Sequence, residues 1–187
     1  MSKRDEVYCY VKWKIEYIYS LADQGTGKGM LAILRRGIGK EPGELPELWG
    51  MIFEKMPDEI IDVKAEWAVY TALTLYALHQ QGNDENVHAD GVSFGTAASA
   101  LVQNKDETDR ILKRLNLVAT ASSMKDLSYH LRGIIQLLKG SDAKLDYARL
   151  AKELYLFRYP EEANRIRLSW AREFYRQYNK NEKENSK

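Results

Sequence analysis

Apolar residues recur at helical spacing along nearly the whole chain, and no stretch alternates apolar and polar residues as a half-buried strand does. The clearest case is residues 59–81, where Ile60, Val63 and Trp67 begin one apolar face. Further helices are predicted over residues 4–23, 27–37, 45–55, 93–103, 105–118, 122–140, 145–159 and 160–179. The pattern therefore predicts an all-α fold, a compact bundle of about eight to nine helices.

Length and composition predict one helical domain over residues 1–179, with a possible division into two small subdomains at the acidic loop 82–92. Residues 180–187 are polar and predicted to be a disordered tail. A single cysteine, Cys9, suits a reducing compartment. Because we also see no targeting segment and no membrane-length apolar run, we expect a cytoplasmic protein that needs no cofactor.

A glycine-rich stretch, "DQGTGKGMLAILRRG" at residues 23–37, raises the question of a phosphate-binding loop. The Walker pattern requires a glycine where the chain has Ala22 and a hydroxyl residue where it has Gly29. The preceding segment also has helical rather than strand periodicity. The stretch is therefore better explained as a turn between two helices that presents cations to something larger.

Charge is distributed unevenly along the chain, although the formal net charge is only +1. Residues 1–40 carry a net +4, residues 41–109 a net −11 and residues 110–187 a net +8. Two basic segments thus flank an acidic middle. Either one surface attracts a polyanion, or the oppositely charged segments neutralise each other across the core.

Cations in the second half fall on helix faces. Arg110, Lys113 and Arg114 are spaced i, i+3 and i+4 beside an apolar stripe. In the last helix Arg165 and Arg172 follow one line, with Arg167 to one side. Such ridges can track a phosphate backbone, but glutamates among them also fit a solvated, ion-paired face.

Signs of catalysis are absent from the sequence. The three histidines are far apart, and loop polarity explains the nearness of His88 to Asp84 and Asp90 better than a metal site does. We see no nucleophile elbow and no paired-carboxylate motif. Most aromatic residues share helical spacing with aliphatic ones, which indicates core packing. We therefore predict that the chain is not an enzyme.

Three stretches resemble CasB, the small-subunit family of the type I-E CRISPR surveillance complex Cascade. They are "GKGMLAILRRG", "VSFGTAASALV" with the following "DETDRILKRLNLVATASSMKDLSYHLRGIIQLL", and "LDYARLAKELYLFRYPEEANRIRLSWAREFY". With "YTALTLYALHQQ" between them, the likeness covers most of residues 25–176. Its weight comes from the order and spacing of the stretches, since none of them is diagnostic alone.

The resemblance implies a non-catalytic, all-helical subunit that is present in two copies among the other Cascade subunits. Its basic surfaces would contact crRNA, target DNA and the displaced single strand, stabilising the R-loop in antiviral defence. By position it implies nucleic-acid contacts for Arg35, Arg36, Arg110, Lys113, Arg114, Arg132 and Lys152. Lys28, near the start of the same helix as Arg35 and Arg36, is expected to assist them. Arg165, Arg167 and Arg172 join this set from the charge pattern.

The chain also departs from the family, since Thr96 and Gly133 stand where arginine is common in relatives. Local affinity for nucleic acid is expected to be lower at these two positions. The acidic segment 41–109 is expected to face basic partner subunits or solvent. The alternative function is a helical protein-interaction scaffold without intrinsic nucleic-acid binding.

Overall fold

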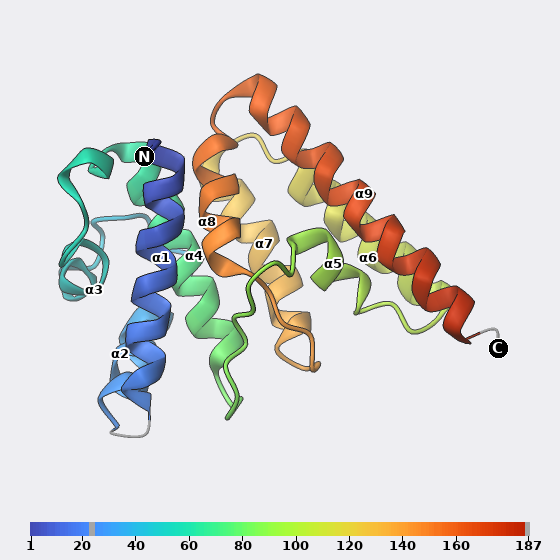
Figure 1. Cartoon of the computed structure of the whole chain (residues 1–187), viewed down its shortest axis with the longest axis horizontal. Helices are drawn as coiled ribbons and strands as arrows, with labels where there is room; N and C mark the ends of the chain where they lie inside the picture. The colour runs from blue at the N-terminus through green and yellow to red at the C-terminus, as the bar shows by residue number, and fades with distance from the viewer. Residues whose placement is uncertain (23–24, 186–187) are drawn as a thin grey trace.

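The structure is a computed structural model and describes residues 1–22 and 25–185. Within these residues it has nine α-helices and two short 3-10 helices, which confirms the predicted all-α fold (Figure 1). The α-helices are α1 (Lys3–Ser20), α2 (Thr26–Arg36), α3 (Trp49–Phe53), α4 (Val63–Gln80), α5 (Phe94–Ser99), α6 (Lys105–Ala119), α7 (Met124–Leu138), α8 (Tyr147–Leu156) and α9 (Pro160–Asn185). The 3-10 helices are η2 (Pro46–Leu48) and η3 (Asp58–Ile60).

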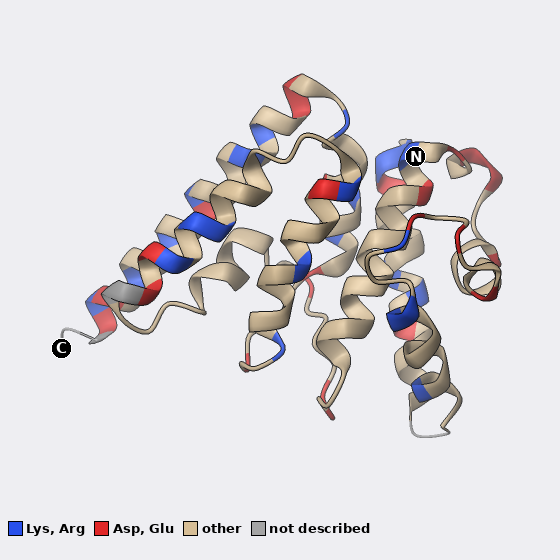
Figure 2. Cartoon of the chain, turned by 180° about the vertical axis from the view of Figure 1, so that it is seen from behind, with Lys and Arg blue, Asp and Glu red and all other residues tan. Residues whose placement is uncertain are grey.

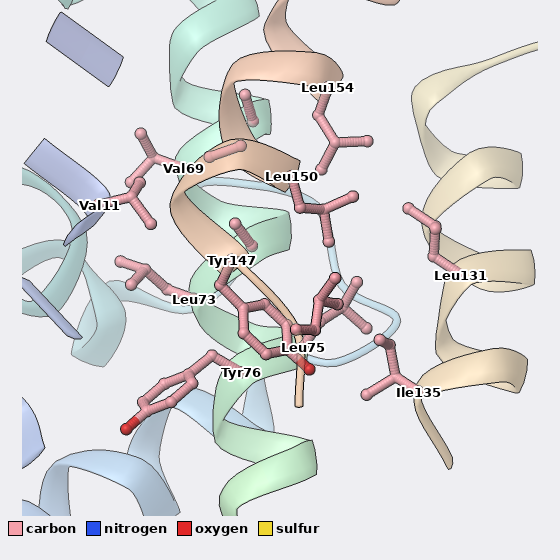
Figure 3. Close-up of a cluster of buried hydrophobic side chains, with 14 of the residues drawn as sticks. Val11, Val69, Leu73, Leu75, Tyr76, Leu131, Ile135, Tyr147, Leu150 and Leu154 are labelled. Carbon is pink, nitrogen blue, oxygen red and sulfur yellow. The ribbon is translucent and has the colours of Figure 1, made fainter. Parts of the chain in front are cut away.

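Helix α4 lies at the centre of the molecule and is apolar on nearly every side. All of its residues from Ala68 to Gln80 are buried. It packs against α1, α2, α7 and α8, and Figure 3 shows side chains from several of these helices meeting around it. A helix that is apolar on all sides is stable only when it is buried, so the other helices pack around α4 and shield it from water.

The two halves of the chain share one core. Figure 1 places α1, α2 and α3 at one end and α5, α6 and α9 at the other, with α4 and α8 between them. Helix α8 comes from the second half of the chain but packs on both α1 and α4. The buried side chains of the described residues form one cluster, so no gap in the core coincides with the loop 82–92.

Glycines allow the close approach of α1 and α2. Gly25 has φ +75°, which favours glycine, and starts α2. A Cβ at Gly27 would lie 2.5 Å from the Ile18 carbonyl oxygen. The stretch is therefore a tight helix–turn–helix corner, as predicted. Asp23 and Gln24, the residues just before it, lie outside the described residues.

Some helix boundaries differ from the predicted ones. Helix α4 begins at Val63 rather than at residue 59, because the Asp62 carboxylate accepts hydrogen bonds from the Lys64 and Ala65 amides. Helix α5 begins after the predicted Ser93 cap but ends at Ser99, short of residue 103. Both ends are set by local hydrogen bonds that apolar periodicity does not reveal.

Helix α9 continues to Asn185, so residues 180–185 are helical where the sequence predicted a disordered tail. Side-chain contacts one turn apart support the extension. Gln177 Nε2 donates to Asn181 Oδ1 at 2.8 Å, and the Tyr178 hydroxyl donates to Glu182 Oε1 at 2.7 Å. Residues 186–187 lie outside the described residues.

Replacement of Gly95 by alanine is expected to weaken the packing of α5 on α9. The new Cβ would lie 2.2 Å from the Trp170 carbonyl oxygen, so the two backbones must separate. We expect Gly95→Ala to lower the free energy of unfolding by about 3 kcal/mol, measured by urea denaturation. Gly133→Ala is the matched control, since its Cβ would meet only the mobile end of Arg114, and should be neutral or stabilising. Equal effects of the two changes would contradict this view of the α5–α9 contact.

Stability should fall in mild acid because of His79, which is fully buried with Nδ1 2.9 Å from the Tyr147 hydroxyl oxygen. Burial lowers the pKa of His79 to about 4. The unfolded chain, with a histidine pKa of about 6.5, therefore binds the proton more readily between these values. We expect the free energy of unfolding to drop by up to about 3 kcal/mol from pH 6.5 to pH 4.

Chemical denaturation across this pH range tests the assignment. His79→Gln should flatten the pH dependence. A pH dependence that survives His79→Gln would show that other groups cause it.

Candidate nucleic-acid interface

Helix α7 presents one polar, exposed face. Its apolar stripe, with Leu127 and Leu131 among its members, is buried against the core as predicted. On the opposite side Lys125, Tyr129 and Arg132 follow each other at i, i+4 and i+7, and all three are exposed. This spacing keeps them on a single line along the helix. The α7 face therefore offers two cations and an exposed ring in a row.

A groove lies between this face and α6. It has a volume of about 570 Å³ and is lined by Arg114 and Leu117 of α6 and by Tyr129, His130, Arg132, Gly133 and Gln136 of α7. We call this set the α6–α7 groove. None of its lining residues is an aspartate or a glutamate. It brings together two arginines that the sequence predicted separately, and both are charged at any physiological pH.

Gly133 leaves room for the Arg114 side chain. A Cβ at this position would lie 3.0 Å from Arg114 Nη1. The missing side chain thus lets the guanidinium lie close against α7. Asp126 does not line the groove, but its Oδ1 lies 3.1 Å from Nε2 of His130, which does.

Arg110 and Lys113 lie on the same helix as Arg114 but outside the groove. Both side chains are exposed. Arg110 is 3.6 Å from the Glu107 carboxylate, a contact that solvent weakens. The three cations of the predicted basic ridge on α6 are thus divided, because Arg114 lines the groove whereas Arg110 and Lys113 are exposed outside it.

Helix α9 carries a second row of cations. Arg165, Arg172 and Arg176 are exposed and share one side of the helix, and Figure 2 shows basic residues along its whole length. Eleven residues of α-helix span about 17 Å, so the row is long enough for several phosphates. Arg165 Nη1 also contacts Glu162 at 2.8 Å. Exposed Leu168 and Tyr175 lie between the arginines.

Arg167 differs from its neighbours on α9. Its guanidinium lies over the Phe157 ring, 4.8 Å from the centroid, and Nη1 donates to Asn164 Oδ1 at 2.9 Å. It lines a pocket of its own, away from the solvent-facing row.

Three predicted cations of the first half, Lys28, Arg35 and Arg36, belong to α2. Lys28 is exposed, whereas Arg35 is partly buried and burial lowers its pKa. Arg36 Nη1 contacts the Glu47 carboxylate at 3.0 Å. None of the three lines the α6–α7 groove, although residues 37–40, which follow α2, line a small pocket together with Arg132 of α7.

Lys152 is engaged within the fold. Its Nζ lies 2.7 Å from Asp5 Oδ1 and joins α8 to α1. The hydrogen bond from Lys152, with one from Ser2, lowers the pKa of Asp5 to about 2. A cation paired in this way has less charge to offer an incoming phosphate.

His88, Asp90 and Asp146 form a cluster whose ligand atoms lie within 4.8 Å of one another. Each side chain already has a structural partner. His88 Nδ1 accepts from the Tyr147 amide at 3.1 Å, which leaves the proton of a neutral ring on Nε2, facing Asp90 Oδ1 at 3.4 Å. Asp146 accepts from the amides of Gly91 and Arg149. These contacts fasten the loop 82–92 to the start of α8 and explain the cluster without a metal ion.

Three exposed residues of α7, Lys125, Tyr129 and Gln136, were not among the predicted nucleic-acid contacts. Their spacing along α7 was a usable signal, because a polar line at i, i+4, i+7 and i+11 marks one exposed face. The groove itself had no such signal, since it depends on how α6 packs against α7. Among the described residues, no helix is long and apolar enough to cross a membrane.

Comparisons with known proteins fit this architecture. A family model described as CRISPR-associated protein Cse2 matches residues 30–175. The crystal structure of CasB from Thermobifida fusca is 34% identical with a TM-score of 0.77, covering 90% of this chain and 97% of that one. No curated protein matches the chain.

More distant structures share the fold. A Cse2-family protein from Thermus thermophilus is 21% identical with a TM-score of 0.71, covering 88% of this chain and 97% of that one. CasB from M. ruber is 24% identical with a TM-score of 0.67, covering 83% and 88%. The family match and the 34% identity over 90% of the chain show that it belongs to the Cse2, or CasB, family of CRISPR-associated Cascade subunits.

Proposed function

We propose that the chain is a non-catalytic, nucleic-acid-binding small subunit of a type I-E Cascade complex in the cytoplasm. Its basic helix faces hold the backbones of crRNA, target DNA and the displaced single strand, and thereby stabilise the R-loop in antiviral defence. The observation that carries the proposal is the α6–α7 groove, where Arg114 and Arg132 line one hollow without a carboxylate among the lining residues.

This kind of surface suits a role that has no sequence code. Arginines bind phosphate through geometry and charge, so they position a strand without reading its bases. In guide-directed recognition, base pairing between the guide RNA and the target strand supplies the sequence specificity. The RNA–DNA duplex that forms is about as stable as the DNA duplex that it replaces. A few added protein contacts to the strand backbones are therefore enough to favour the R-loop.

The α9 row extends the same chemistry over a longer distance. Exposed Leu168 lies between Arg165 and Arg172, and exposed Tyr175 lies next to Arg176. These two side chains give the row an apolar component. Single-stranded nucleic acid is commonly bound by cations interleaved with stacking or apolar groups. The row is thus suited to a displaced strand, whose bases are unpaired.

The acidic segment 41–109 suits protein neighbours. Glu44, Glu47, Asp58 and Glu59 are exposed around α3 and the turns beside it. A carboxylate-rich surface repels nucleic acid and attracts basic protein surfaces. We assign this end of the molecule to contacts with other Cascade subunits, a second copy of the chain included.

A scaffold without intrinsic nucleic-acid binding is the second candidate. The observation in its favour is that some of the predicted cations are already paired, with Arg36 bound to Glu47 and Lys152 to Asp5. A protein of this kind would use its arginines to bind acidic partner surfaces. It would ignore DNA and RNA at physiological salt.

Neutralising the groove should reduce binding to every strand alike. We expect Arg114→Gln/Arg132→Gln to weaken the affinity for single-stranded DNA and RNA without changing any sequence preference. Loss of two phosphate contacts should lower the log–log salt slope by about 1.4 for single strands. Fluorescence anisotropy of labelled strands at low and physiological salt measures both quantities.

The matched control is Lys3→Gln/Lys144→Gln, which removes the same charge from two exposed lysines paired with Asp62 and Glu85. Its salt slope should stay close to that of the parent chain. Equal losses in both double variants would mean that net charge, and not the groove, governs binding. Absence of binding by the parent chain at low salt would favour the scaffold.

A further inference from the structure

A second hollow lies at the corner where α8 turns into α9. It has a volume of about 620 Å³, within the range of small-molecule sites. We call it the corner pocket and define it by Trp67 of α4, Lys125 of α7, Phe157 and Arg158 of the turn, and Asn164 and Arg167 of α9. Every charged residue that lines it is a cation.

Arg167 is held in place before any ligand arrives. Phe157 is stacked on Trp170, with ring centroids 5.7 Å apart and planes at 18°, and the Arg167 guanidinium covers Phe157. Asn164 Oδ1 accepts from Nη1, and the buried Nε has no partner among the described residues. An arginine fixed by a ring and a neighbouring amide loses little freedom on binding, and its guanidinium carries the positive charge that attracts an anion.

The other cations differ in how free they are. Arg158 is exposed in the turn before α9, and its side chain has no ion pair in the described part of the chain. Lys125 is bound to Glu41 at 3.0 Å, so it contributes less to an incoming charge. At the start of α7 the Asp126 amide donates to Ser123 Oγ, and the Ser122 amide donates to Asp126 Oδ2, so these two amides are engaged. The anion site is therefore formed by side chains rather than by backbone amides, and mainly by Arg158 and Arg167.

Trp67 gives the pocket an aromatic wall. It is partly exposed and packs against the core on its other side. A hollow that combines arginines with an exposed indole matches the two parts of a nucleotide, a phosphate and a flat base. A base inside a duplex cannot enter a hollow of this shape, so the occupant must be unpaired.

We propose that the corner pocket binds one unpaired nucleotide, with its phosphate against Arg158 and Arg167 and its base against Trp67. This inference rests on the proposed function, because the nucleotide in the pocket would be one residue of the bound single strand. The exposed face of α7 joins this pocket to the α6–α7 groove. Lys125 lines the pocket and Arg132 the groove, seven residues or about 10 Å further along the helix.

The test follows the indole N–H signal of Trp67 by NMR, assigned among the four tryptophans with Trp67→Phe. Thymidine 5′-monophosphate, thymidine and inorganic phosphate are titrated separately. We expect the monophosphate to shift the Trp67 signal, thymidine to shift it only weakly, and phosphate alone to shift Arg167 Nε but not Trp67. Absence of a Trp67 shift at saturating monophosphate would overturn the proposal, and so would equal shifts with phosphate alone, which indicate an anion site only.

Arg167→Gln should weaken monophosphate binding about tenfold, the effect of losing one strong contact. Lys144→Gln is the matched control, because Lys144 is exposed, pairs with Glu85 and does not line the pocket. Equal affinities in the two variants would count against the pocket. Overall folding is checked by unfolding midpoints, since Arg167 also packs on Phe157.

A labelled single strand separates this inference from the proposed function. If the strand binds the parent chain and Arg167→Gln equally but loses affinity in Arg114→Gln/Arg132→Gln, the function stands and the pocket proposal fails. If no strand binds but the monophosphate still shifts Trp67, the pocket proposal stands and the function fails.

Discussion

Glu153 of α8 holds the cation-bearing helix α9 against the core. This carboxylate is 8% exposed and accepts from Trp170 Nε1 at 2.7 Å and from Arg149 Nε at 2.8 Å. Arg149 in turn contacts Glu173 of α9 at 2.7 Å. Removing one member of a buried pair of this kind typically costs about 3–5 kcal/mol, because a charge is left without its partner. The α9 row and the corner pocket both depend on these contacts between α8 and α9. Arg149 is paired with two carboxylates in them, so its charge is neutralised within the fold.

The chain uses its arginines and lysines in two ways. Some are paired within the fold, as with Arg36 and Glu47 or Lys152 and Asp5, and there they connect elements. In the α6–α7 groove and the corner pocket they line hollows without carboxylates. Paired cations contribute little to binding a polyanion, whereas unpaired ones can release counterions from a strand. The surface that a strand can use is therefore smaller than the number of basic residues suggests.

Local patterns predicted the helices well, because apolar periodicity and caps such as Ser93 act over a few residues. The start of α4 was misplaced because Asp62 caps the helix inside an apolar, helix-like run. The candidate site was less predictable. The pairing of Lys152 with Asp5 joins residues 147 positions apart, and the groove needs α6 and α7 to pack at one particular angle. Such contacts are set by the tertiary fold, so a sequence pattern identifies the cations but not the ones that remain free.

The central claim is that the second half of the chain, and not the α1–α3 end, holds nucleic acid. Photo-cross-linking of a single strand containing 4-thiothymidine, followed by peptide mapping, tests it directly. We predict cross-links at Trp67 and within residues 110–136 and 158–176, which together carry the groove, the α7 face, the corner pocket and the α9 row. Cross-links confined to residues 1–60 would contradict the account.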